Sequence, residues 1–201
     1  MLPWSSITYL GDSALTVPFA AVLALWLLLD GKKGPAVRWT LVFCAGMALV
    51  VLTKLAFIGW NIGLPGLNFT GISGHSASAM SVLPVMVFLL VAGLPLPVRI
   101  VLIGAAFILI VFIGVSRAVL HAHSESEVVV GLALGACMSL YFIACADIGE
   151  RFMGKRPIVL LAIFLLAGSS GGRPAPTQDW LVRIAVTLSG NQQPYMRATP
   201  L

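Results

Sequence analysis

The chain has 201 residues, of which 59% are hydrophobic and only 9% are charged. Soluble domains carry about 25% charged residues, so 12 basic and 7 acidic side chains are too few to cover a globule of this size. The apolar content also excludes a disordered chain. With a mean hydropathy of +1.02, the composition predicts a membrane protein built of α-helices. The net charge of +5 then bears on which loops face the cytoplasm, and it does not indicate nucleic-acid binding.

Apolar runs near the length that crosses a bilayer, about 20 residues, recur along the chain. The first 13 residues contain no Lys or Arg, so they lack the basic region of a signal peptide and the first run is expected to be retained. The last run is short and either spans with a tilt or re-enters. We therefore predict an all-α polytopic bundle of about six spans, at residues 14–29, 36–60, 77–91, 98–115, 127–146 and 157–168.

The domain organisation follows from these runs. Residues 1–170 are expected to form a single transmembrane domain, and residues 171–201 a polar tail in which residues 180–188 form an amphipathic interfacial helix. Gly131 and Gly135 have the spacing of a helix-packing motif. Three cysteines lie inside apolar runs and are expected to be buried, which argues against a disulfide framework or a zinc site; they are Cys44, Cys137 and Cys145.

Basic residues predict the orientation. The loops after the second and fourth spans contain only Lys54 and Arg117, at the ends of their spans. Because cytoplasmic loops are enriched in Lys and Arg, these two loops should face outward. The loops after the first, third and fifth spans should be cytoplasmic, since they contain Lys32, Lys33, Arg38, Arg99, Arg151, Lys155 and Arg156.

The outer span ends also collect polar groups that are costly in a membrane, about 2.5–3.5 kcal/mol for each ionisable side chain. Two cations there suit an anionic ligand, and the start of the third span offers free backbone N–H groups. Two imidazoles can attack and donate a proton, and a carboxylate four residues after the second can orient it. The groups are Lys54, Ser73, Gly74, His75, Ser76, Ser116, Arg117, His123, Glu125 and Glu127.

In order and spacing these residues resemble the motifs of the type-2 phosphatidic acid phosphatase family, Lys-x6-Arg-Pro, Pro-Ser-Gly-His and Ser-Arg-x5-His-x3-Asp. The resemblance covers about residues 54–135, with the motifs in 54–127. It implies a bundle core like that of the family and a phosphatase without metal or other cofactor. His123 would be the nucleophile, Glu127 its orienting carboxylate and His75 the acid. The phosphate would be bound by Lys54, Ser73, Gly74, Ser116, Arg117 and Asn61.

The sequence departs from this pattern at three positions. Asn61 and Ile62 replace the Arg-Pro of the first motif, so one phosphate-binding arginine is missing and Asn61 offers only a hydrogen bond. Ile72 replaces a proline, and Glu127 replaces an aspartate while keeping its charge. The first departure bears on the substrate and the rate.

Several alternatives stay open. His121 does not fit the spacing and is interpreted as a loop or interfacial residue, and Glu125 as a residue solvated at the mouth of the site, with binding of a head-group amine as the alternative. A metal site built on His123 and Glu127 is disfavoured. We expect a phosphatase in a bacterial inner membrane with its site facing the periplasm, acting on a lipid such as undecaprenyl diphosphate, phosphatidylglycerol phosphate or phosphatidic acid. A lipid phosphotransferase and a non-catalytic lipid-binding relative are the alternatives, and the oligomeric state is left open.

Overall fold

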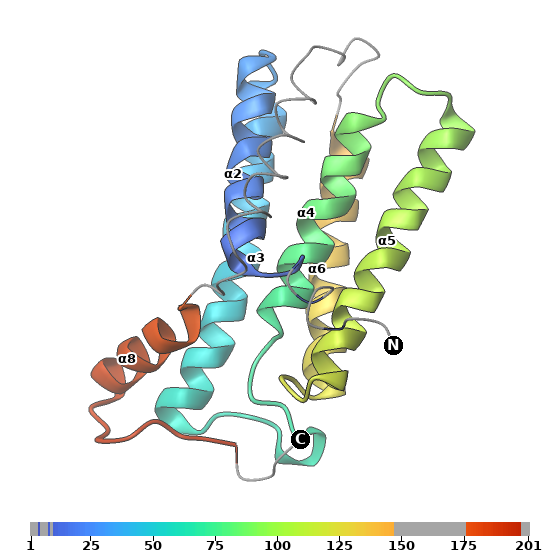
Figure 1. Ribbon diagram of the computed structural model, residues 1–201. Helices are drawn as coiled ribbons and strands as arrows, with labels where there is room; N and C mark the ends of the chain where they lie inside the picture. Colours follow the sequence, from blue (N-terminus) through green and yellow to red (C-terminus); the bar gives the residue numbers. More distant parts are fainter. Residues whose placement is uncertain (1–3, 5–7, 9, 147–175, 198–201) are drawn as a thin grey trace.

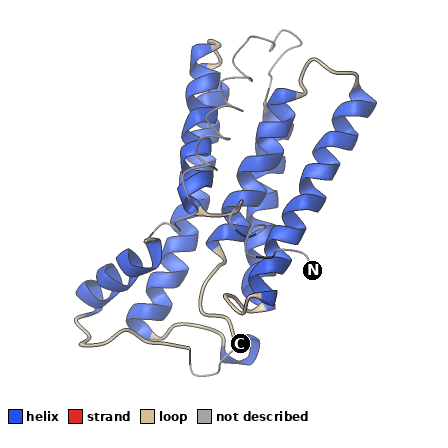
Figure 2. Ribbon diagram, viewed as in Figure 1, coloured by secondary structure: helices blue, strands red, loops and turns tan. Residues whose placement is uncertain are grey.

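The computed structural model describes residues 4, 8, 10–146 and 176–197. This part of the chain consists of helices joined by loops and turns, and no strand is drawn in it (Figure 2). The predicted all-α architecture is therefore confirmed.

Long helices run side by side as a bundle, and a shorter helix lies at an angle against one of them (Figure 1). The shorter helix, α8 (Thr177–Ser189), packs against α3 and corresponds to the amphipathic segment predicted in the tail. The bundle consists of α2 (Ser13–Leu29), α3 (Lys33–Trp60), α4 (Gly74–Leu90), α5 (Leu96–Val119) and α6 (Glu125–Cys145).

Three helices, α3, α5 and α6, are long and apolar enough to cross a membrane, with 28, 24 and 21 residues. The apolar helices α2 and α4 have 17 residues each, about 26 Å of helix at 1.5 Å per residue. The chain is thus a multi-pass membrane protein whose helices lie within a few residues of the predicted spans. The sixth predicted run, residues 157–168, lies outside the described residues.

Helix α4 forms the centre of the bundle and packs most extensively against α6. The two backbones come close because α6 has glycines where they meet. A Cβ atom at Gly131 would lie 2.7 Å from the carbonyl oxygen of Ser73, and one at Gly135 would collide with that of Ala77. The interpretation of this glycine pair as a packing motif is therefore confirmed.

The loop between α3 and α4 is fastened at both ends. Helix α3 ends where Asn61 adopts a left-handed conformation, with φ of 56°, as Asn often does at helix ends. After the 3-10 turn η1 (Pro65–Leu67), the N–H of Ile72 donates to Oγ1 of Thr53 at 3.1 Å. The N–H of Ser73 then donates to the carbonyl oxygen of Glu127 at 3.2 Å. The start of α4 is thereby fixed relative to α3 and α6.

The three cysteines, Cys44, Cys137 and Cys145, are free thiols and exposed. The prediction that they are buried within the protein is therefore wrong. The apolar runs that contain Cys137 and Cys145 present these positions to the surroundings of the bundle, which are lipid in a membrane, whereas Cys44 lines a cavity.

We expect Gly135→Leu to lower the free energy of unfolding by about 1–3 kcal/mol, because overpacking of a close helix contact forces the backbones apart. Thermal unfolding of the detergent-solubilised protein measures the effect. Gly104→Leu in α5 is the matched control, since a Cβ there has no atom within 4 Å. Equal stability of the two variants would contradict the assigned α4–α6 contact.

Candidate active site

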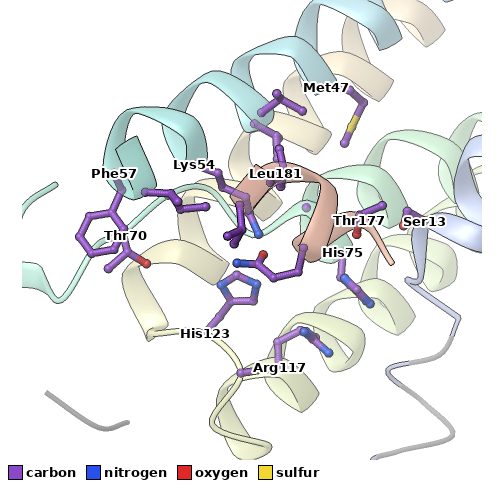
Figure 3. Close-up of a pocket in the computed structure, with 18 of the residues that line it drawn as sticks. Ser13, Met47, Lys54, Phe57, Thr70, His75, Arg117, His123, Thr177 and Leu181 are labelled. Carbon is purple, nitrogen blue, oxygen red and sulfur yellow. The ribbon is translucent and has the colours of Figure 1, made fainter. Parts of the chain in front are cut away.

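Polar side chains from several helix ends surround one cavity of about 1130 Å³. Figure 3 shows Lys54, His75, Arg117 and His123 gathered around it. They come respectively from α3, the first turn of α4, the last turn of α5 and the loop before α6. The structure thus brings together four residues that the sequence placed at one end of the bundle.

His123 is held by Glu127. Its Nδ1 lies 2.6 Å from Oε2 of Glu127, a carboxylate with no exposed side-chain surface. His123 itself precedes α6, whose N-cap is Ser124. Oε2 of Glu127 also accepts the N–H of Ser124 at 3.2 Å, which completes a capping box. Because Nδ1 is directed at the carboxylate, Nε2 is the ring nitrogen available to a substrate.

The second oxygen of Glu127 is equally well bound. Oε1 accepts hydrogen bonds from the N–H of Thr70 at 2.7 Å and from the hydroxyl of Thr70 at 2.6 Å. It also accepts one from Nη2 of Arg197 at 2.7 Å. A buried carboxylate is stable only with such partners. The orientation of Glu127, and through it that of His123, is therefore fixed by the loop after α3, by the tail and by the segment before α6.

The protonation state of His123 suits a nucleophile. Burial lowers the pKa of His123 from its usual value of 6.5, and the positive charges of Lys54 and Arg117 act in the same direction. The hydrogen bond and the negative charge of Glu127 oppose this shift without reversing it. The ring is therefore neutral at neutral pH, with a lone pair for attack.

The other imidazole has its own carboxylate. Nε2 of His75 lies 3.3 Å from Oδ2 of Asp12. Asp12 is 4% exposed and caps α2, since its Oδ1 accepts the N–H of Ala14 at 2.8 Å. The start of α2 thus orients the ring of His75 at the cavity wall.

The two predicted cations also reach the cavity. Arg117 donates from Nη1 to the hydroxyl of Thr8 at 3.1 Å, and its Nε is buried without a hydrogen-bond partner among the described residues. Lys54 lies against Gly71, where φ is +144° and a Cβ would come within 2.9 Å of Cγ of Lys54. A glycine at position 71 therefore provides both the backbone conformation and the room for the lysine stem.

The start of α4 offers main-chain donors. Ser73 is its N-cap but makes no side-chain cap bond, so the first-turn N–H groups of α4 have no side-chain cap, and Gly74 and His75 of this turn line the cavity. The predicted hydroxyl donors are directed elsewhere. Oγ of Ser73 is buried 3.0 Å from Oγ of Ser76, and Oγ of Ser116 donates to the carbonyl oxygen of Ile113 at 2.6 Å.

Three further residues from the sequence analysis do not line the cavity. Asn61 is exposed at the end of α3. His121 is exposed in the turn after α5, with φ of 51°, and Glu125 is exposed in the first turn of α6. The structure thus separates His121 and Glu125 from the polar cluster.

Sequence reasoning missed Asp12, Thr70 and Arg197. Asp12 lies at the start of the first span, at the same end of the bundle as the other polar residues, so the argument used for those span ends could have found it. Thr70 is an uncharged residue in a Gly-rich loop, and Arg197 is 70 residues from Glu127. Nothing in their local sequence indicates a site, because tertiary packing alone brings them to the carboxylate.

The described part of the chain contains no group of three His, Cys, Asp or Glu side chains arranged to bind a metal ion. The side chains of Lys54, Arg117 and Arg197 bring positive charge to the cavity. A guanidinium or ammonium group of this kind binds phosphate oxygens directly.

Comparison with known proteins agrees with these motifs. The model of the PAP2 superfamily matches residues 59–150, which include His75, His123 and Glu127. The chain is 35% identical over 202 residues to an "Uncharacterized 22.5 kDa protein in cps region" of Klebsiella pneumoniae, and the alignment covers 96% of this chain and 95% of that protein. No solved structure matches significantly. Family match, motif order and helical architecture together show that the chain belongs to the PAP2 superfamily, the type-2 phosphatidic acid phosphatase-like proteins.

Proposed function

We propose that this protein is a lipid phosphatase that hydrolyses a lipid phosphate or diphosphate at the periplasmic face of a bacterial inner membrane. Membership in the PAP2 superfamily supports phosphatase activity on phosphate esters. The observation that carries the finer proposal is the shared cavity of Lys54, His75, Arg117 and His123, with His123 hydrogen-bonded to Glu127.

The proposed reaction has two steps. Nε2 of His123 attacks phosphorus as the bond to the leaving oxygen breaks, and His75 donates a proton to that oxygen. Water then attacks the phosphohistidine, His75 takes the proton of the water, and phosphate leaves. Lys54, Arg117 and the N–H of Gly74 bind the phosphate oxygens and stabilise the charge of the transition state.

The binding roles of Ser73, Ser116 and Asn61 stay predictions. The hydroxyls of the two serines hydrogen-bond within the bundle, and Asn61 lies outside the cavity wall. A phosphate contact from any of them requires a side-chain rotation or a movement of the loop that follows α3.

The shape of the cavity supports a lipid substrate. From its polar end it continues along α2, α3 and α8, where apolar side chains line it: Val17, Phe43, Met47, Val51 and Leu181. An apolar groove that opens from a phosphate site suits a phosphate ester with a hydrocarbon chain. Undecaprenyl diphosphate, phosphatidylglycerol phosphate and phosphatidic acid all have this form.

The proposed orientation rests on the basic residues of the chain. The site lies at the ends of α3 and α5 that carry Lys54 and Arg117, opposite the ends that begin near Lys33 and Arg99. Because basic loops stay in the cytoplasm, this distribution supports a periplasmic site. We propose that residues 1–170 form the membrane domain and residues 171–201 the tail, whose described part, residues 176–197, packs against α3.

We expect the purified protein to release phosphate from a lipid phosphate in the presence of EDTA, and His123→Ala to lower the rate by about 10⁴-fold or more, as removal of a covalent nucleophile does. His121→Asn is the matched control, because Asn tolerates positive φ and His121 lies outside the cavity. A fully active His123→Ala variant would exclude the phosphohistidine.

Two other outcomes would favour the alternative functions. Labelled phosphate transferred to a second lipid would favour a phosphotransferase, and lipid binding without any turnover would favour a non-catalytic relative.

The pH profile of kcat/KM tests the state of His123. Since its pKa lies below 6.5 and the neutral ring is the nucleophile, the rate should fall on acidification with a midpoint below 6.5. Glu127→Gln removes the group that raises this pKa, so the midpoint should move to still lower pH. The ionisation of the substrate, measured separately by phosphorus NMR, is the control. A midpoint that moves upward in the variant would contradict the assigned pair.

The apolar groove gives a test of the substrate class. Ala48→Trp places a large ring at the groove wall and should raise KM for a long-chain lipid phosphate, while KM for a water-soluble aryl phosphate stays unchanged. Leu49→Trp is the control, since the neighbouring side chain is exposed and does not line the cavity. An equal effect on both substrates would show that the groove does not hold the lipid chain.

A further inference from the structure

The site contains a cation that the family motifs do not supply. Arg197 follows α8 in the C-terminal tail and lines the same cavity as Lys54 and His123. Only 19% of its side chain is exposed. The first family motif has a phosphate-binding arginine at the position of Asn61, so this chain lacks that cation.

The guanidinium of Arg197 is only half used. Nη2 donates to Oε1 of Glu127 at 2.7 Å and to the hydroxyl of Thr70 at 3.0 Å. Nη1 is buried and has no hydrogen-bond partner among the described residues. A buried N–H group without a partner is costly, and native structures rarely leave one unexplained. Because Arg197 lines the cavity, a small rotation of its guanidinium would bring this N–H group to an anion bound there.

The guanidinium of Arg117, which lines the same cavity, is also only partly hydrogen-bonded. Nε of Arg117 is also buried without a partner in the described part of the chain, while its Nη1 binds Thr8. Two arginines that line one cavity therefore each have an N–H group to spare for a ligand with several acceptor oxygens. A phosphate group has that property.

The tail is held in place along the end of α3, beside the position of the missing arginine. The carbonyl oxygen of Gly59 accepts from Nδ2 of Asn191 at 2.6 Å, and that of Ile58 accepts from the N–H of Tyr195 at 2.9 Å. Gly59 also lets α8 approach, because a Cβ there would come within 3.3 Å of the carbonyl oxygen of Ala185. Figure 1 shows the segment after α8 running back under α3.

We infer that Arg197 is a phosphate-binding residue of this protein and takes over the role of the arginine that is absent at Asn61. This inference rests on the proposed function and deepens it. Nη2 keeps Glu127 in the orientation that holds His123, and Nη1 binds an oxygen of the phosphate that Lys54 and Arg117 also bind. The third cation of the site is thereby supplied by the tail.

The test compares Arg197→Gln, Arg197→Lys and Arg197→Ala with Arg183→Gln, a control that removes the same charge from an exposed position of α8. We expect Arg197→Gln to lower kcat/KM and to weaken inhibition by inorganic phosphate, each by about 10- to 100-fold, as for the loss of one charge-assisted hydrogen bond. Arg197→Lys should have a kcat/KM and a phosphate affinity between those of the wild type and Arg197→Gln. Millimolar guanidinium should partly restore the kcat/KM of Arg197→Ala. Arg183→Gln should match the wild type.

A separate measurement keeps this inference distinct from the proposed function. Calorimetric binding of inorganic phosphate to the protein with His123→Ala requires no turnover, and adding Arg197→Gln should weaken it by the same factor. If the wild type hydrolyses no lipid phosphate but this difference persists, the catalytic proposal fails and the binding role stands. If phosphate binding is absent or indifferent to Arg197, or if the variant loses rate without losing phosphate affinity, Arg197 only supports Glu127 and the inference is wrong.

Discussion

The buried carboxylate of Glu127 is the constraint on which the site depends. A charged group with no exposed surface requires several hydrogen bonds, and here they come from His123 and Ser124 before α6, from Thr70 in the loop after α3, and from Arg197 in the tail. These partners belong to three different parts of the chain. The carboxylate therefore joins these segments and, in doing so, sets the direction in which Nε2 of His123 can act.

Packing beneath the site keeps those segments in register. The glycine face of α6 lets it lie directly on α4, and the main-chain bond between Ser73 and Glu127 joins the first turns of the two helices. His75 and His123 are consequently carried by neighbouring helix ends. Polar chemistry at this end of the bundle is compatible with a membrane because the remaining length of α4, α5 and α6 is apolar.

The sequence predicted the helices well, because long apolar runs leave few other structures open to a backbone in lipid. It also predicted which side chains meet, since residues at the same ends of antiparallel spans must share a membrane face. The direction of individual side chains could not be predicted from the sequence. Ser73 and Ser116 fit the motifs, yet their hydroxyls form hydrogen bonds within the bundle. The contribution of Arg197 was equally hidden, because it follows from how the tail packs on α3. Asp12 was the one neighbour whose position at a span end held a usable signal.

The contact between Arg197 and Glu127 has a consequence for biosynthesis. Ribosomes make the chain from its N-terminus, so the helices that carry both histidines are released toward the membrane before residue 197 has been translated. During that interval the Glu127 carboxylate lacks one of its partners and the cavity lacks a cation. Insertion of the bundle and completion of the polar cluster are therefore successive events, and a ribosome that stalls within the tail leaves a membrane-inserted protein whose site is still unfinished.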